Sequence, residues 1–142
     1  MHWMTYVKHA YEVVLESEAK ECIHLDHEIE AYVVHLWARY IDKPLINKDP
    51  ICIKLMSSLD LPTHQKKEQL KSVGDECLLI NGLQLQRKKW PSDTYYKDMG
   101  QIAFQAIAHV EYPPEIFFEE LAGKFDLISR ILNNCTLNRL HP

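Results

Sequence analysis

Two neighbouring segments show which class of fold this chain adopts: Gly74-Asp75-Glu76-Cys77-Leu78-Leu79-Ile80-Asn81-Gly82 and Tyr95-Tyr96-Lys97-Asp98-Met99-Gly100. Apolar residues lead into the first segment at helical spacing, and a helix is expected from Thr63 to Gly82, where glycine takes the left-handed turn past the terminus. The second segment belongs to another amphipathic helix, expected over residues 92 to about 110. Together the two segments predict helices that are joined by short turns.

The same apolar spacing extends in both directions from these segments. Further helices are expected around Val7–Val14, from an N-cap at Asp26 to Lys43, around Ile51–Ser58, and from Pro114 to about Leu132. Strand-like alternation occurs only in Leu83–Gln86, which is too short to build a sheet. The sequence therefore predicts an all-α protein of five or six helices in an antiparallel, bundle-like array, with no sheet of three or more strands.

Length and charge narrow the class of protein. The 142 residues match one domain, so residues 1–142 are expected to form a single helical domain. The net charge of -4 argues against a nucleic-acid partner, and the basic run Arg87-Lys88-Lys89-Trp90 is expected to be a solvated connector. No apolar run is long enough to span a membrane, and the start of the chain does not read as a signal peptide. A cytoplasmic protein with four reduced cysteines, acting as small core residues, is expected.

The segment from Gly74 to Leu132 resembles a family of bacterial proteins to which no activity is assigned. The shared pattern is Gly-Asp, an apolar run and Gly, a basic connector, a Tyr-Tyr…Met-Gly…Ala helix and a Glu-Leu…Phe…Leu helix. In this chain the pattern is carried by Gly74-Asp75, Leu78-Leu79-Ile80, Gly82, Tyr95-Tyr96, Met99-Gly100, Ala103, Glu120-Leu121, Phe125 and Leu127. The resemblance implies a helical fold and supplies no function.

Metal-ligating residue types gather in one stretch, at Glu21, His24, His27 and Glu28, with His35 further on. Glu-x-x-His spacing, as in the first pair, occurs in di-iron bundles, which need two such pairs. The third and fourth residues begin a zinc-type His-Glu-x-x-His whose second histidine is missing. On one continuous helix over residues 21–42, a polar stripe opposite an apolar stripe would form, which is typical of a solvated face. Its members would be Glu21, His24, Glu28, Ala31, His35 and Asp42. A solvated face and a metal site both remain open.

Asp75 is the second candidate. It follows Gly74 within a helix, and two poor helix formers in succession indicate a tertiary contact that offsets their cost. We expect its carboxylate to accept a hydrogen bond from Tyr95, from Tyr96 or from a backbone N–H at a helix start. The alternative is that Asp75 forms one wall of a small-ligand pocket with either tyrosine.

No complete catalytic set is present, because the four glycines are isolated and no nucleophile motif occurs. The sequence favours a protein that acts by association, with itself or with another protein, over an enzyme, and no cofactor is expected. Small residues on helix faces support this interpretation, and Gly100 and Ala103 are expected to lie at a close crossing with the Phe117–Leu132 helix. The alternative is a metal-dependent or small-ligand-binding helical protein.

Overall fold

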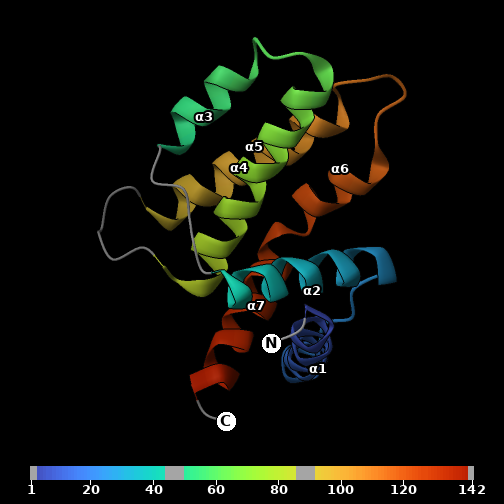
Figure 1. Cartoon of the computed structure of the whole chain (residues 1–142), viewed down its shortest axis with the longest axis vertical. Coiled ribbons are helices and arrows are strands. Elements are labelled where there is room, and N and C mark those ends of the chain that lie inside the picture. Colours follow the sequence, from blue (N-terminus) through green and yellow to red (C-terminus); the bar gives the residue numbers. More distant parts are fainter. Residues whose placement is uncertain (1–2, 44–49, 86–91, 141–142) are drawn as a thin grey trace.

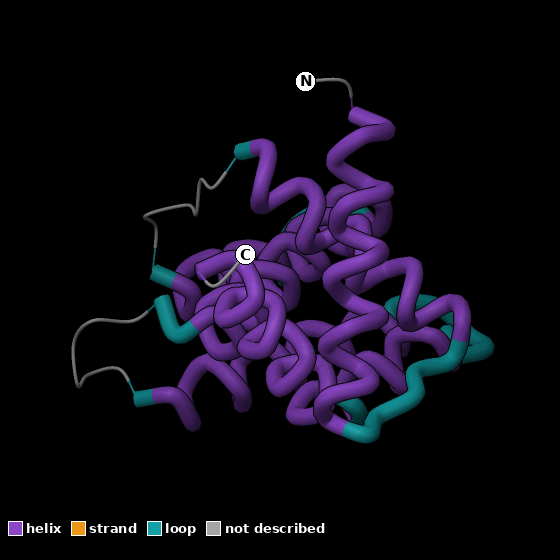
Figure 2. The backbone as a smooth tube through the Cα atoms, turned by 90° about the horizontal axis from the view of Figure 1, so that it is seen from below, coloured by secondary structure: helices purple, strands orange, loops and turns teal. Residues whose placement is uncertain are grey.

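The computed structural model describes residues 3–43, 50–85 and 92–140, and in this part of the chain all regular structure is helical (Figures 1 and 2). The helices are α1 (Trp3–Glu21), α2 (His27–Asp42), α3 (Ile51–Ser58), α4 (Thr63–Leu83), α5 (Asp93–Ala108), α6 (Ile116–Gly123) and α7 (Phe125–Leu140). The all-α prediction is confirmed. The Arg87–Trp90 connector and Pro44 lie outside the described residues.

α4 runs through the middle of the molecule and contacts α3, α5 and α7. α6 packs on α5, while α1 packs on both α2 and α7. Figure 1 shows α2 lying across the lower part of the molecule and α1 viewed end-on, whereas α3, α4 and α5 run side by side. The arrangement therefore differs from the predicted antiparallel array, because the first two helices cross the others.

The helix count also differs from the prediction, because residues 114–132 form two helices instead of one. α6 ends at Gly123, and Lys124 leaves the helical conformation, with φ -99° and ψ 13°. α7 then begins at Phe125. The break has a packing consequence: α6 lies mainly against α5, whereas α7 runs against α4 and α1.

Two glycines mark close helix crossings. Gly82 does not end its helix, as predicted, but lies inside α4, where an added Cβ would come within 2.8 Å of Cβ of Leu132 on α7. The left-handed position belongs to Gln84, with φ 55°. At Gly100 an added Cβ would meet the ring of Phe125 and would lie 2.8 Å from Cβ of Cys77. The predicted close crossing at Gly100 is therefore confirmed.

Apolar side chains of every described helix contribute to the core, and α3 contributes least, with Ile51 buried and Leu55 packed partly buried against it. The largest fully buried members of the core include Trp37, Phe104 and Phe125. Cys77 and Cys135 are buried as expected, but Cys22 and Cys52 are exposed, so only half of the cysteines serve as core residues. No helix in the described part of the chain is both long and apolar enough to cross a bilayer.

Candidate functional site

α4 directs two adjacent carboxylates to different neighbours. Asp75 contacts Tyr32 and Arg39 of α2, whereas Glu76 contacts Lys54 of α3. Successive residues of an α-helix are about 100° apart around its axis, so one step along α4 moves the carboxylate from one neighbouring helix to the other. The candidate site is built around these two contacts.

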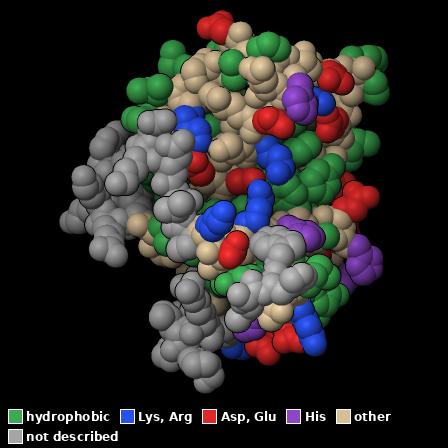
Figure 3. Space-filling view, viewed as in Figure 1, with side chains coloured by type: hydrophobic (Ala, Val, Ile, Leu, Met, Phe, Trp, Pro, Cys, Tyr) green, Lys and Arg blue, Asp and Glu red, His purple; other side chains and the backbone are tan. Residues whose placement is uncertain are grey.

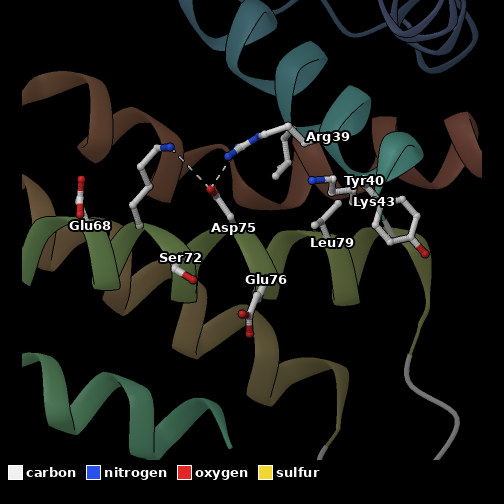
Figure 4. A pocket seen from close by; sticks show the side chains of 10 residues that line it. Arg39, Tyr40, Lys43, Glu68, Ser72, Asp75, Glu76 and Leu79 are labelled. Carbon is white, nitrogen blue, oxygen red and sulfur yellow. Dashed lines mark hydrogen bonds and ion pairs between the residues drawn. The ribbon is translucent and has the colours of Figure 1, made fainter. Parts of the chain in front are cut away.

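The Asp75 carboxylate lies between Tyr32 and two cations, and Figure 4 shows its two contacts with the cations as dashed lines. The hydroxyl of Tyr32 donates a hydrogen bond to Oδ1. On the other oxygen, Oδ2 lies 3.4 Å from Nη2 of Arg39 and 3.9 Å from Nζ of Lys71. Burial raises the pKa of the Asp75 carboxyl above its ordinary value, and the Tyr32 hydrogen bond and the two cations oppose that rise.

Tyr32 connects this polar cluster to the aromatic core. Its ring packs against Phe104 of α5 and Phe117 of α6, with centroid separations of 6.4 and 5.6 Å. Nζ of Lys71 lies 5.4 Å from the centroid of the same ring. Burial, and then the charge of Asp75, raise the pKa of Tyr32 far above its ordinary value. The hydroxyl therefore keeps its proton and acts as a donor.

The predicted hydrogen bond to Asp75 is confirmed, but the predicted donors were wrong. Tyr95 and Tyr96 pack edge to face on α5, and burial and the neighbouring Cys77 thiol raise the pKa of Tyr96. Cys77 follows Asp75 by two residues, or about 200° around the helix, so it lies on nearly the opposite side of α4. Neither Tyr95 nor Tyr96 lines the hollow beside Asp75.

That hollow lies between α2 and α4 and has a volume of about 480 Å³. Arg39, Tyr40 and Lys43 border it from α2, and Lys71 and Asp75 border it from α4. Figure 4 shows the Arg39 side chain reaching toward Asp75. The hollow therefore combines a buried carboxylate of α4 with basic side chains from both sides.

The other carboxylate anchors α3 by polar contacts. Nζ of Lys54 donates to Oε1 of Glu76 at 2.7 Å and to Oγ of Ser72 at 3.1 Å. The side chain of Gln69 on α4 donates to the Lys54 carbonyl and to Oγ of Ser57. The side chains of Lys54 and Glu76 are each only 12% exposed. These polar contacts join the inward packing of Ile51 and Leu55 in holding α3 on the rest of the fold.

The opposite side of α3 and the residue that follows it are apolar and face outward. Ile53, Met56 and Leu59 keep 58%, 68% and 63% of their surface exposed. A surface helix normally buries its apolar stripe and exposes its polar one. α3 departs from this rule because it is apolar on both sides: Ile51 and Leu55 pack inward against the core, while Ile53 and Met56 face outward.

The histidine-rich stretch does not lie on one helix. The predicted polar stripe required a continuous helix over residues 21–42. α1 ends at Glu21 and α2 begins at His27, and Cys22 between them has a positive φ of 55°. The side chain of His24 is 87% exposed, with Nδ1 3.9 Å from Oε2 of Glu18. His27, Glu28 and His35 are exposed on α2.

Glu21 borders a different, polar hollow, together with residues of α4 and α7. Within the described residues, no three histidine, cysteine or acidic side chains stand close enough to hold a metal ion. The five predicted metal candidates are therefore not brought together there.

A pair of buried glutamates lies between α1 and α2, and the sequence did not predict it. Glu18 and Glu30 are each 5% exposed, and Oε2 of Glu18 accepts a hydrogen bond from the Leu25 N–H at 3.2 Å. Burial, and then the hydrogen bond with Glu30, raise the pKa of Glu18 to about 7. Two glutamates on separate amphipathic segments give no local signal of this contact, because it depends on how the helices pack.

Comparison of the chain with protein-family models, curated proteins and solved structures found no match. The resemblance of residues 74–132 to a bacterial family therefore stays a prediction, and the geometry alone carries the functional argument.

Proposed function

We propose that this protein works by association, that the outer face of α3 is the contact surface, and that the partner there is a second copy of the chain. One observation carries the proposal: α3 is anchored through Lys54 and its inward residues, and it still leaves Ile53, Met56 and Leu59 exposed. Exposed apolar patches of this kind are typical of interaction sites. Burying such surface contributes about 25 cal/mol per Å².

The patch suits pairing with itself. None of its three members carries a charge, so two copies related by a twofold axis can meet without opposing like charges. The Lys54–Glu76 contact also holds α3 in place before any partner arrives. A preformed surface loses less conformational entropy on binding than a mobile one.

α1 offers a rival surface, because Tyr11 and Leu15 are also exposed, at 45% and 41%. These side chains are more buried than those of the α3 patch, and α1 packs by its other sides on α2 and α7. The α3 patch is therefore the stronger candidate, and the two surfaces can be told apart by substitution.

Sedimentation velocity over a wide concentration range tests the proposal. We expect wild-type protein to dimerise with increasing concentration, Met56→Lys to stay monomeric, and Ile116→Lys to behave as wild type. Ile116 is a matched control because it is as exposed as Met56, at 68%, but lies on α6. A reductant is needed because Cys52 of α3 is exposed. A wild-type chain that remains monomeric throughout contradicts the proposal, and loss of dimer in Leu15→Lys alone moves the contact to α1.

A further inference from the structure

We infer that the hollow between α2 and α4 binds a small organic anion, with a carboxylate or phosphate head beside Arg39 and Lys71 and an apolar body along the helix surfaces. The inference does not rest on association through α3, because no residue of α3 lines the hollow. It rests on the charge of the lining side chains, on the approach of Arg39 and Lys71 to one oxygen of Asp75, and on the size of the hollow.

The charge that faces solvent in the hollow is mainly positive. Arg39 is 50% exposed and Lys71 is 39% exposed, and Lys43 at the end of α2 is also exposed. By contrast, the carboxylates of Asp75 and Glu76 are only 11% and 12% exposed, and each already contacts a cation of the protein. Figure 3 shows Lys and Arg side chains interspersed with Asp and Glu near the middle of the face in view.

One carboxylate stands apart from this pattern. Glu68 is 69% exposed at the rim, and Oε1 lies 3.2 Å from Nε2 of His64, on the outer surface of α4. With Glu76 paired to Lys54, the three cations of the lining face the two carboxylates of Asp75 and Glu68, a surplus of one positive charge. A dissolved anion is therefore attracted to the hollow, and a dissolved cation is not.

The two principal cations converge on one atom. Nη2 of Arg39 and Nζ of Lys71 both lie within 4 Å of Oδ2 of Asp75, at 3.4 and 3.9 Å. A guanidinium carries five N–H donors in a planar fork and an ammonium carries three. The contacts with Asp75 therefore leave donors that can bind a ligand. Asp75 thus positions the two cations, and an oxyanion that bridges them would gain charged hydrogen bonds and relieve their mutual repulsion.

The rest of the lining is mixed, with an apolar part beside the polar Ser72 and Glu76. Leu36 and Leu79, which are 2% and 8% exposed, line the hollow together with Tyr40. A volume of about 480 Å³ falls within the usual range of about 300–1,000 Å³ for small-molecule sites. An inorganic ion would leave these walls unused, so the ligand class that fits is an anion with an aromatic or aliphatic body.

Titration calorimetry with phenyl phosphate and benzoate tests the inference, with inorganic phosphate and benzylamine as comparison probes. We expect saturable binding of at least one aromatic anion, weaker binding of inorganic phosphate, and none of benzylamine. The stronger of the two aromatic anions identifies the head group. Arg39→Gln and Lys71→Gln are each expected to weaken binding by about tenfold or more.

Lys97→Gln is the matched control, because Lys97 also pairs with an aspartate, Asp126 at 2.8 Å, but on α5 and away from the hollow. It should bind the probes as wild type does. Lys71 is partly exposed, so its substitution keeps the test valid if Arg39→Gln does not fold. Absence of saturable binding, equal binding of inorganic phosphate, preference for benzylamine, or unchanged affinity in Lys71→Gln would each overturn the inference.

Discussion

α2 and α3 both contact α4 through adjacent carboxylates, but α2 keeps its large apolar side chains inward, whereas α3 exposes Ile53 and Met56 in addition to the apolar side chains that it packs inward. α2 buries Val33 and Trp37, and its contact with Asp75 lies at the edge of that apolar packing. α3 contacts Glu76 through Lys54 on its inward side, and its Met56 is exposed to solvent. The comparison teaches that a polar anchor does not decide which face of a helix is buried. Where the apolar face is left outside, a contact beyond the monomer is the physical reason that we propose.

The largest expected effect separates the apolar faces of the two helices. Trp37→Ala should destabilise the fold by about 3–5 kcal/mol, because the side chain is 1% exposed and its removal leaves a cavity. Met56→Ala, on the exposed face of α3, should change the free energy of unfolding of the monomer by less than about 0.5 kcal/mol. Urea unfolding at low protein concentration measures both. Similar losses in the two variants would show that the α3 patch is buried within the monomer.

A smaller effect is expected at the anchor of α2. Asp75→Ala should cost about 1.5–3 kcal/mol, since it removes charged hydrogen bonds and leaves the Tyr32 hydroxyl buried without its acceptor. Tyr32→Phe should cost less, and the double variant should cost less than the two single losses together, because the residues share one interaction. Thermal and urea unfolding provide the double-mutant cycle.

Asp126→Ala is the control for Asp75→Ala. It removes the aspartate of the exposed Lys97 pair, and such pairs contribute about 0–1 kcal/mol. Full additivity of the Tyr32 and Asp75 substitutions would contradict the contact between α2 and α4.

Much of the fold could be predicted from local patterns. The bounds of α3 were predicted at Ile51–Ser58, and α2 was predicted from an N-cap at Asp26, as observed. Apolar spacing and proline positions are local properties of the chain, so they suffice for such bounds. The same spacing did not reveal the break at Lys124, because that break reflects the different packing partners of α6 and α7.

The site was less predictable than the helices. That Asp75 needs a partner could be predicted from its place after Gly74, but its donor, Tyr32, lies 43 residues earlier in the chain. Periodicity gives the face of a helix and not the angle at which another helix crosses it. For the same reason, the sequence of α3 shows an apolar stripe at Ile53 and Met56 without showing that the stripe faces outward.

The pH dependence of stability tests the contact between α1 and α2, where Glu18 and Glu30 are buried. The pKa of Glu18 is raised to about 7 in the folded protein, from an ordinary value of 4.5. Between these values the folded state holds more protons than the unfolded state, so stability falls as pH rises through this window. The expected loss between pH 5 and pH 8 is about 2–3 kcal/mol. Glu30 of α2, Cys135 of α7 and the exposed His24 are the other ionisable groups that lie near this carboxyl.

In Glu18→Gln the side chain at position 18 is neutral at every pH, so stability should change less with pH in this window. Melting temperatures of wild type and variant, measured in parallel from pH 5 to pH 8, isolate the contribution of Glu18 from that of the histidines. Parallel profiles for the two proteins would show that the glutamate is not buried between α1 and α2.

Methyl NMR of the wild-type chain over a concentration series tests the outward face of α3 most directly, because it compares exposed apolar residues within one molecule. Association through this face predicts that the methyl signals of Ile53, Met56 and Leu59 shift together along one binding curve. The methyl signals of Ile116, which is equally exposed on α6, and of the buried Ile29 should stay in place. Signals of Ile116 that move while those of Met56 do not, or a spectrum unchanged by concentration, would contradict association through α3.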